Sequence, residues 1–230
     1  MSYLILVRHG ESRWNLQNRF TGWVNVPLSA KGLQEARLCS EIVNAIPIDI
    51  AFTSELIRAQ ETLLVLLSEA NCTGLFVDEK KGLARWGNYK PAKEKEIPIV
   101  RSQKLNERYY GKLQGLNKHS ASEIFGKEQV FSWRRGYKIT PPGGESLYDV
   151  YKRSVPYFKK NILSELEKGK NVLVCAHGNS LRAIIKYIEH IGDEEIPFLE
   201  LATGKPEVYK FVHGSFIKIT SDKGFKRPHK

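Results

Sequence analysis

The chain has 230 residues, of which 41% are hydrophobic and 10% aromatic, so it can bury a substantial core and is not globally disordered. Its apolar stretches are too short to cross a membrane, and no basic region precedes the first of them, so we predict neither a membrane span nor a secretory signal. The formal net charge of +11 suits two kinds of partner, nucleic acids and small phosphorylated metabolites.

Two further features of the composition bear on the partners, the compartment and metal binding. No basic stripe is interleaved with aromatic residues, so we expect no nucleic-acid partner. The three cysteines, Cys39, Cys72 and Cys175, are widely spaced and do not have metal-ligand spacing. Such a sparse, odd set is typical of free thiols in a reducing compartment. We therefore expect a cytoplasmic protein without a bound metal.

Short apolar runs alternate with amphipathic segments along the chain. The patterns predict strands at 48–53, 75–77, 207–212 and 216–220, in addition to apolar runs at 4–7 and 172–176. They predict helices from Ser29 to Pro47, from Ser54 to about 70, and at 120–125, 128–135, 145–168 with a kink at Pro156, and 181–191 closed by Gly192. Alternating strands and helices with buried strands predict a three-layer α/β sandwich, with a mostly parallel central sheet flanked by helices.

The domain organisation follows from the segments between these elements. No internal segment resembles a linker, so residues 1–220 are expected to form a single α/β domain. Residues 80–118 show no clear periodicity, and a connection of that length is usually functional or mobile. The basic residues at 221–230 are expected to be a solvated, flexible tail.

Two segments far apart in the sequence share one pattern. Leu4–Val7 leads into Arg8-His9-Gly10-Glu11-Ser12, and Val172–Ala176 leads into His177-Gly178-Asn179-Ser180. If both runs are parallel strands of one sheet, both histidines lie at carboxyl ends, where open α/β sheets bind their ligands. Two imidazoles beside glycine backbone and helix N-termini form a suitable site for a phosphoryl group. A lone histidine after a strand is usually structural, but the second copy favours an enzyme.

Phosphoryl transfer requires positioning, charge neutralisation and, where an intermediate forms, a nucleophile. His9 can be that nucleophile because neutral imidazole attacks phosphorus and leaves again. Arg8 and Arg58 can each hold phosphoryl oxygens with two hydrogen bonds, although Arg58 alone would be read as a surface arginine. His177 can stabilise charge that develops on the phosphoryl oxygens.

The residue that moves the proton is left open by the sequence pattern. Glu107 lies in the irregular stretch, where functional loops concentrate. Glu11 is closer to His9 and, from spacing alone, is the better candidate for a general acid and base. Lys118, Arg134 and Arg135 are either partners of phosphate and carboxylate groups or ordinary exposed basic residues.

Five blocks of the sequence are more specific than these patterns. They are Arg8-His9-Gly10-Glu11-Ser12 with Asn15, Phe20-Thr21-Gly22-Trp23, residues 105–118, Trp133-Arg134-Arg135-Gly136, and residues 176–182. Together they resemble the cofactor-dependent phosphoglycerate mutases of the histidine phosphatase superfamily, and the resemblance extends from residue 4 to about residue 210. It implies a single catalytic domain with a phosphoglycerate mutase-like fold.

The resemblance also implies a role for each matching residue. His9 would be the phosphorylated histidine, and Glu107, rather than Glu11, the proton donor and acceptor. Arg8, Arg58 and His177 would form the phosphoryl pocket. The phosphate and carboxylate ends of the substrate would be bound by Ser12, Asn15, Thr21, Gly22, Tyr110, Lys118, Arg134, Arg135, Gly178 and Asn179.

The reaction implied by the resemblance is the interconversion of 3-phosphoglycerate and 2-phosphoglycerate in glycolysis and gluconeogenesis. The enzyme would be primed by 2,3-bisphosphoglycerate and would need no metal. Many members carry a long segment associated with subunit contacts where only Gly143-Gly144 stands here, so we expect a monomer or homodimer. An extra loop at about 80–104 precedes the third block, and it would cover the site, form an interface, or do neither.

Two other functions stay open at this point. A broad-specificity histidine phosphatase would use the same His9 chemistry but admit water to the phosphohistidine, which depends on how well the site closes. A non-enzymatic protein that binds phosphorylated ligands or nucleic acid is favoured only by the net charge.

Overall fold

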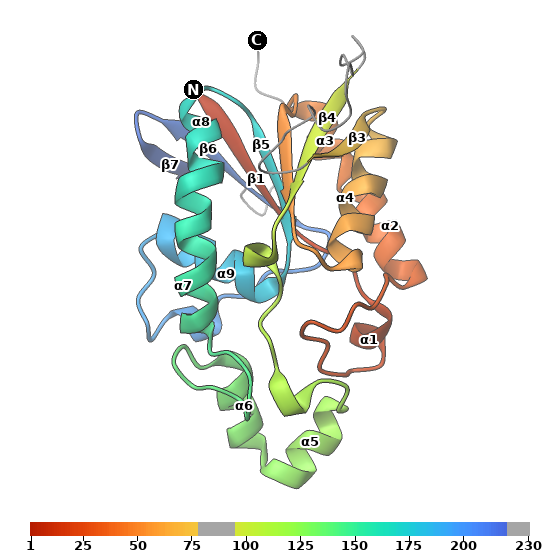
Figure 1. Cartoon of the computed structure of the whole chain (residues 1–230), viewed down its shortest axis with the longest axis vertical. Coiled ribbons are helices and arrows are strands. Elements are labelled where there is room, and N and C mark those ends of the chain that lie inside the picture. Colours follow the sequence, from red (N-terminus) through yellow and green to blue (C-terminus); the bar gives the residue numbers. More distant parts are fainter. Residues whose placement is uncertain (78–94, 220–230) are drawn as a thin grey trace.

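The computed structural model describes residues 1–77 and 95–219, without the side chains of residues 42–44. The expected tail at 221–230, and most of the expected extra loop, lie outside the described residues. A seven-stranded sheet in the order β3-β4-β2-β5-β1-β6-β7 forms the centre of the molecule (Figure 1). The strands are β1 (Ser2–Arg8), β2 (Ile50–Thr53), β3 (Thr73–Val77), β4 (Glu96–Arg101), β5 (Val172–Ala176), β6 (Pro206–Val212) and β7 (Ser215–Lys218).

The strands that carry the two histidine motifs are direct neighbours. β1 pairs with β5 in parallel, with Leu4 opposite Val172 and Arg8 opposite Ala176. β5 also pairs in parallel with β2, so the carboxyl ends of β1, β2 and β5 lie at the same edge of the sheet. β6 and β7 continue the sheet in the antiparallel sense beyond β1.

Helices cover both faces of this sheet (Figure 1). They are α1 (Arg13–Leu16), α2 (Ala30–Leu38), α3 (Ser40–Ala45), α4 (Ile57–Glu69), α5 (Lys118–Phe125), α6 (Lys127–Arg135), α7 (Leu147–Tyr157), α8 (Ser164–Glu167) and α9 (Gly178–Ile188). Short helical turns are η2 (Gln103–Leu105), η3 (Gly111–Leu113), η4 (Phe158–Leu163) and η5 (Ile196–Phe198). In the described residues, none of these helices combines the length and apolarity needed to cross a bilayer.

The alternation of side chains along β1 explains the three layers. Leu4 and Leu6 pack in one cluster, with residues of α9 and of the segment from α7 to α8. Ile5 and Val7 point to the opposite face and pack with residues of α4 and with Cys39 and Ile46, which flank α3. A strand buried on both faces must be apolar at every position, which is the pattern seen before each histidine. The predicted three-layer α/β sandwich with a mostly parallel sheet is confirmed.

Some predicted elements differ from the observed ones. The strand β4 was not predicted, because it lies in the stretch that showed no clear periodicity, and it contains Pro98 although proline is rare inside strands. The helix expected from Ser29 to Pro47 is divided into α2 and α3 at Cys39. The helix expected at 181–191 begins three residues earlier and ends at Ile188, so Gly192 does not close it.

The long helix expected at 145–168 is interrupted rather than simply kinked. α7 continues through Pro156 and is followed at once by η4, a π-helical segment, and then by α8. Proline has no backbone N–H to donate to the preceding turn, so the regular hydrogen-bond pattern is broken there. The wider π-helical turn is a usual way to absorb such a defect.

The backbone after His9 lies tightly against the first turn of α2. A Cβ atom on Gly10 would lie 2.3 Å from the carbonyl oxygen of Gly32, and one on Gly32 would lie 2.1 Å from the carbonyl oxygen of Glu11. Real Cβ atoms do not approach backbone so closely, so only glycine fits at either position. This contact fixes the loop that holds His9.

We predict that Gly32→Ala destabilises the protein, although glycine to alanine inside a helix usually stabilises it by about 1 kcal/mol. The overpacking against Glu11 should outweigh that gain and lower the free energy of unfolding by about 1–3 kcal/mol. Chemical denaturation measures the change, with Lys31→Ala on the exposed face of the same turn as control. Equal or greater stability of Gly32→Ala would contradict the tight contact.

Candidate active site

His9 follows β1 directly and is almost completely buried. Its backbone N–H donates to the Ala176 carbonyl at 3.0 Å, which ties it to the end of β5. Its Nδ1 lies 2.6 Å from the Gly10 carbonyl oxygen, and because a carbonyl only accepts, Nδ1 carries the proton. The lone pair of the neutral imidazole is therefore on Nε2.

The surroundings of His9 keep this imidazole neutral. Burial lowers its pKa well below 6.5, and the positive charges of Arg58 and Arg8 lower it further. Nε of Arg58 donates to Nε2 of His9 at 3.3 Å, which occupies the lone pair only weakly. A buried neutral imidazole with an available Nε2 is a competent nucleophile for a phosphoryl group.

Two arginines flank His9. Arg58 in α4 is fully buried, and its two terminal nitrogens donate to the carbonyls of Val24 and Gly22 at 3.0 and 2.7 Å. Burial lowers the pKa of Arg58 to about 10, so the guanidinium stays charged at neutral pH. Arg8 donates from Nη1 to the Leu201 carbonyl at 2.6 Å, while its buried Nε has no partner among the described residues.

His177 follows β5 and packs edge-on against His9, with the ring centroids 4.9 Å apart. It is fully buried, and burial, Arg58 and His9 lower its pKa well below 6.5. Its Nε2 lies 2.7 Å from Oγ of Ser54, which also accepts from the backbone N–H of Leu56. Ser54, expected to cap α4, instead contacts the second histidine.

The structure separates the two glutamates that competed for the proton-transfer role. Oε1 of Glu107 accepts from Nδ2 of Asn179 at 2.7 Å and from the backbone N–H of Arg108 at 2.7 Å, and Glu107 lines the same cavity as His9. Glu11 accepts instead from Oγ of Ser29 at 2.8 Å and does not line that cavity. The geometry favours Glu107 as the acid and base.

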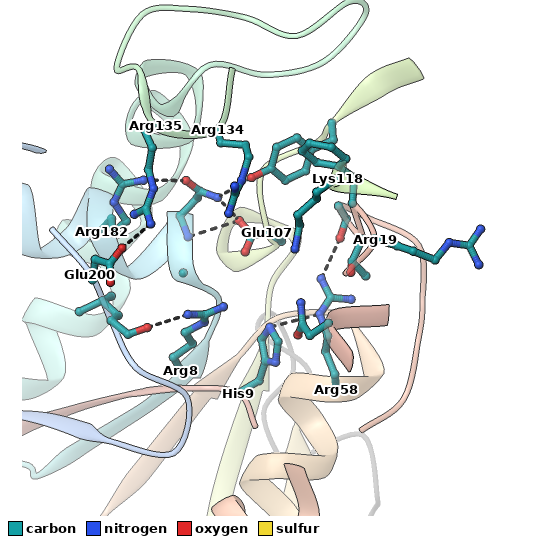
Figure 2. Close-up of a pocket in the computed structure, with 18 of the residues that line it drawn as sticks. Arg8, His9, Arg19, Arg58, Glu107, Lys118, Arg134, Arg135, Arg182 and Glu200 are labelled. Carbon is teal, nitrogen blue, oxygen red and sulfur yellow. Dashed lines mark hydrogen bonds and ion pairs between the residues drawn. The ribbon is translucent and has the colours of Figure 1, made fainter. Parts of the chain in front are cut away.

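The cavity has a volume of about 430 Å³ and a strongly cationic wall (Figure 2). The predicted residues that line it are Arg8, His9, Asn15, Thr21, Gly22, Arg58, Glu107, Tyr110, Lys118, Arg134, Arg135, Gly178 and Asn179. Two predicted residues do not line it. His177 is fully buried against His9, and Ser12 is the N-cap of α1, where its Oγ accepts from the backbone N–H of Asn15.

The cationic residues of the wall crowd one another. Burial lowers the pKa of Lys118 to about 8, and the charges of Arg134 and Arg8 add to that effect. Burial also lowers the pKa of Arg134. Because such crowding is unfavourable without counter-charge, the wall is suited to bind an anion. Oγ1 of Thr21 and Nε of Arg8 are buried without a partner among the described residues, so they are available to a phosphate group.

Sequence patterns missed three charged residues of the cavity, namely Arg19, Arg182 and Glu200. Arg182 in α9 donates from Nη1 to Oδ1 of Asn179 at 3.2 Å, which orients the amide whose Nδ2 contacts Glu107. Its position one turn after the second histidine motif was the available signal. Glu200 lies in a loop after η5, and no local pattern marked it.

The described residues contain no group of three or more His, Cys, Asp or Glu side chains suited to hold a metal ion. The expectation of a reaction without metal stays a prediction.

Comparison with known proteins identifies the family. The family model of the histidine phosphatase superfamily, branch 1, matches residues 4–90 and 89–219. The chain is 48% identical over 239 residues to a 2,3-bisphosphoglycerate-dependent phosphoglycerate mutase of Methanosarcina acetivorans, with 96% of each chain covered. It is 47% identical to a protein of the same name from Chlamydia muridarum, with 95% of this chain and 97% of the relative covered.

Solved structures share the fold at lower identity. Mycobacterial hydrolase 1 matches with a TM-score of 0.76 and 20% identity, covering 96% of this chain and 98% of the other. A mycobacterial glucosyl-3-phosphoglycerate phosphatase matches with a TM-score of 0.73 and 22% identity, covering 95% of this chain and 98% of the other.

The family model and the curated relatives show that the chain belongs to the histidine phosphatase superfamily and, within it, to the family of 2,3-bisphosphoglycerate-dependent phosphoglycerate mutases.

We predict that stability falls as the pH drops below about 6.5, because both buried histidines have lowered pKa values in the folded state. The unfolded chain then binds more protons than the folded one. Each histidine should cost up to about 1.4 kcal/mol of unfolding free energy per pH unit until its folded pKa is reached. Denaturation between pH 7.5 and 5 measures the slope.

His9→Gln should lose about half of this slope, whereas His119→Gln, which removes an exposed histidine, should keep all of it. An unchanged slope in His9→Gln would show that His9 is not buried in its neutral form.

Proposed function

We propose that the protein interconverts 3-phosphoglycerate and 2-phosphoglycerate through a phosphohistidine at Nε2 of His9. The observation that carries this proposal is the neutral His9 in one cavity with Glu107 and a cationic wall. The relatives' shared name supports the same reaction and implies 2,3-bisphosphoglycerate as cofactor. The unpartnered polar atoms of Arg8 and Thr21 fit such a polyanion.

The two ends of the cavity bind different groups of the substrate. Arg8 and Arg58 hold the oxygens of the phosphoryl group that is transferred. His177, which packs against His9, stabilises charge on the same oxygens. Lys118, Arg134 and Arg135 hold the opposite end of the substrate, with Tyr110 and Asn179 nearby. The backbone at Gly178 lies beside Arg8 and Glu107. Asn15, Thr21 and Gly22 close the side next to Arg58, and Ser12 holds Asn15 through the cap of α1.

The chemistry proceeds by two related transfers at His9. Bound 2,3-bisphosphoglycerate supplies the phosphoryl group that primes the enzyme. Nε2 of His9 forms the P–N bond as the P–O bond to the ligand breaks, and Glu107 gives a proton to the oxygen that leaves. In the reverse transfer Glu107 removes the proton of the attacking substrate hydroxyl, and His9 is released. Reorientation of the ligand between the transfers changes which oxygen keeps its phosphate.

Hydrolysis is the competing outcome at the same phosphohistidine. It requires water to reach phosphorus while the cavity is occupied. The solved hydrolase and the solved phosphatase are only 20% and 22% identical to this chain, so their likeness concerns the fold and gives no support for hydrolysis here. We further propose phosphoglycerates as ligands and a monomer or homodimer in the cytoplasm, with no nucleic-acid partner.

The direct assay follows conversion of 3-phosphoglycerate to 2-phosphoglycerate in the presence of EDTA, with and without added 2,3-bisphosphoglycerate. We expect activity that survives chelation and rises with the bisphosphate. Inorganic phosphate is measured in parallel. Its release without isomerisation would replace the mutase with a phosphatase, and loss of activity in EDTA would contradict the metal-free reaction.

We predict that Glu107→Gln lowers the rate of transfer by about 10²- to 10⁴-fold, because the amide cannot exchange a proton with the substrate oxygen. His9 should still be phosphorylated by a donor with a good leaving group, which needs no acid. Glu11→Gln is the matched control and should change the rate little, because Glu11 lies outside the cavity. The opposite ranking of the two variants would return the role to Glu11.

A further inference from the structure

The cavity contains a carboxylate that the proposed reaction does not use. Glu200 lines the cavity, and its Oε1 pairs with Nη2 of Arg135 (Figure 2). Among the lining residues, Glu107 is the other acidic side chain, and it belongs to the proton-transfer site. Glu200 therefore places a negative charge on a wall that is otherwise suited to bind anions.

The Glu200–Arg135 pair lies across the cavity from Arg58 (Figure 2). In the proposed function, this part of the cavity binds the anionic group of the ligand that is not being transferred to His9. An anionic group that binds Nη2 of Arg135 must share or displace Glu200, because Oε1 of Glu200 already accepts from that nitrogen. Burial lowers the pKa of neighbouring Arg134 and the Glu200 carboxylate opposes that effect, so its field reaches this part of the wall.

The pair is easily broken. The side chain of Glu200 is 75% exposed and that of Arg135 is 25% exposed. An exposed ion pair of this kind changes an equilibrium by less than about fivefold. The backbone beside Glu200 is fixed by the hydrogen bond from Arg8 to the Leu201 carbonyl. Displacement thus requires only that the Glu200 side chain rotate toward solvent, without movement of the loop.

We propose that Glu200 is a specificity-determining residue that competes with the distal anionic group of the ligand for Arg135. This inference rests on the proposed function, in which a phosphate or carboxylate occupies that end. The competition weakens binding of every ligand with an anion at the distal end. It leaves unchanged the binding of inorganic phosphate, which needs only the end near His9. Glu200 thus limits how tightly 2,3-bisphosphoglycerate is retained.

The test is equilibrium binding of two probes, 2,3-bisphosphoglycerate and inorganic phosphate, by calorimetry at fixed ionic strength. His9→Gln serves as the background, so that no phosphoryl group is transferred during the titration. Glu200→Gln should bind 2,3-bisphosphoglycerate about two- to fivefold more tightly and inorganic phosphate with unchanged affinity. Glu69→Gln is the matched control, because Glu69 also pairs with an arginine, Arg37, and does not line the cavity.

A double-mutant cycle locates the effect. With Arg135→Met, the substitution Glu200→Gln should no longer tighten binding beyond the Glu69→Gln control. Equal tightening for both probes, or a gain that persists without Arg135, would show a general charge effect and overturn the competition. Unchanged 2,3-bisphosphoglycerate binding by Glu200→Gln would overturn the inference alone. No binding of this ligand to any variant would contradict the proposed function as well.

Discussion

The hydrogen bond from Nδ1 of His9 to the Gly10 carbonyl is the constraint on which the rest of the site depends. It fixes the tautomer, so that Nε2 presents its lone pair toward Arg58 and the cationic cavity. Burial and the charges of Arg58 and Arg8 then keep the imidazole neutral. Without this bond the proton could lie on Nε2. His9 would then have no lone pair on that nitrogen and could not act as the nucleophile there.

The fold supplies this arrangement through the sheet edge. Because β1 and β5 are parallel neighbours, their carboxyl ends bring His9 and His177 together, and the adjacent β2 leads to Ser54 and the helix of Arg58. The distal cations come from a separate part, where α5 begins at Lys118 and α6 ends at Arg134 and Arg135. A buried end at His9 and Arg58 is thereby combined with a half-buried end at Lys118, Arg134 and Arg135.

Sequence patterns predicted the three layers because residues such as Leu4 and Ile5 alternate between two apolar faces. They did not predict β4, which contains Pro98 and lies in the stretch without clear periodicity. The two histidines were predicted as site residues because the carboxyl ends of strands are where open α/β sheets bind ligands. Arg58 was a candidate for the same pocket, although its local pattern alone indicated a surface arginine. The choice of Glu107 required the family resemblance. Glu200 could not be found, because its meeting with Arg135, 65 residues away in the sequence, is set by tertiary packing.

The central claim is that Nε2 of His9 carries the phosphoryl group. The most direct measurement is ³¹P NMR of ¹⁵N-histidine-labelled protein charged with 2,3-bisphosphoglycerate, where ³¹P–¹⁵N coupling identifies the bonded nitrogen and peptide mass spectrometry identifies the residue. We expect one phosphohistidine, at Nε2 of His9, that is absent from His9→Gln. A phosphoryl group on Nδ1, on His177, or on no histidine during active turnover would contradict it.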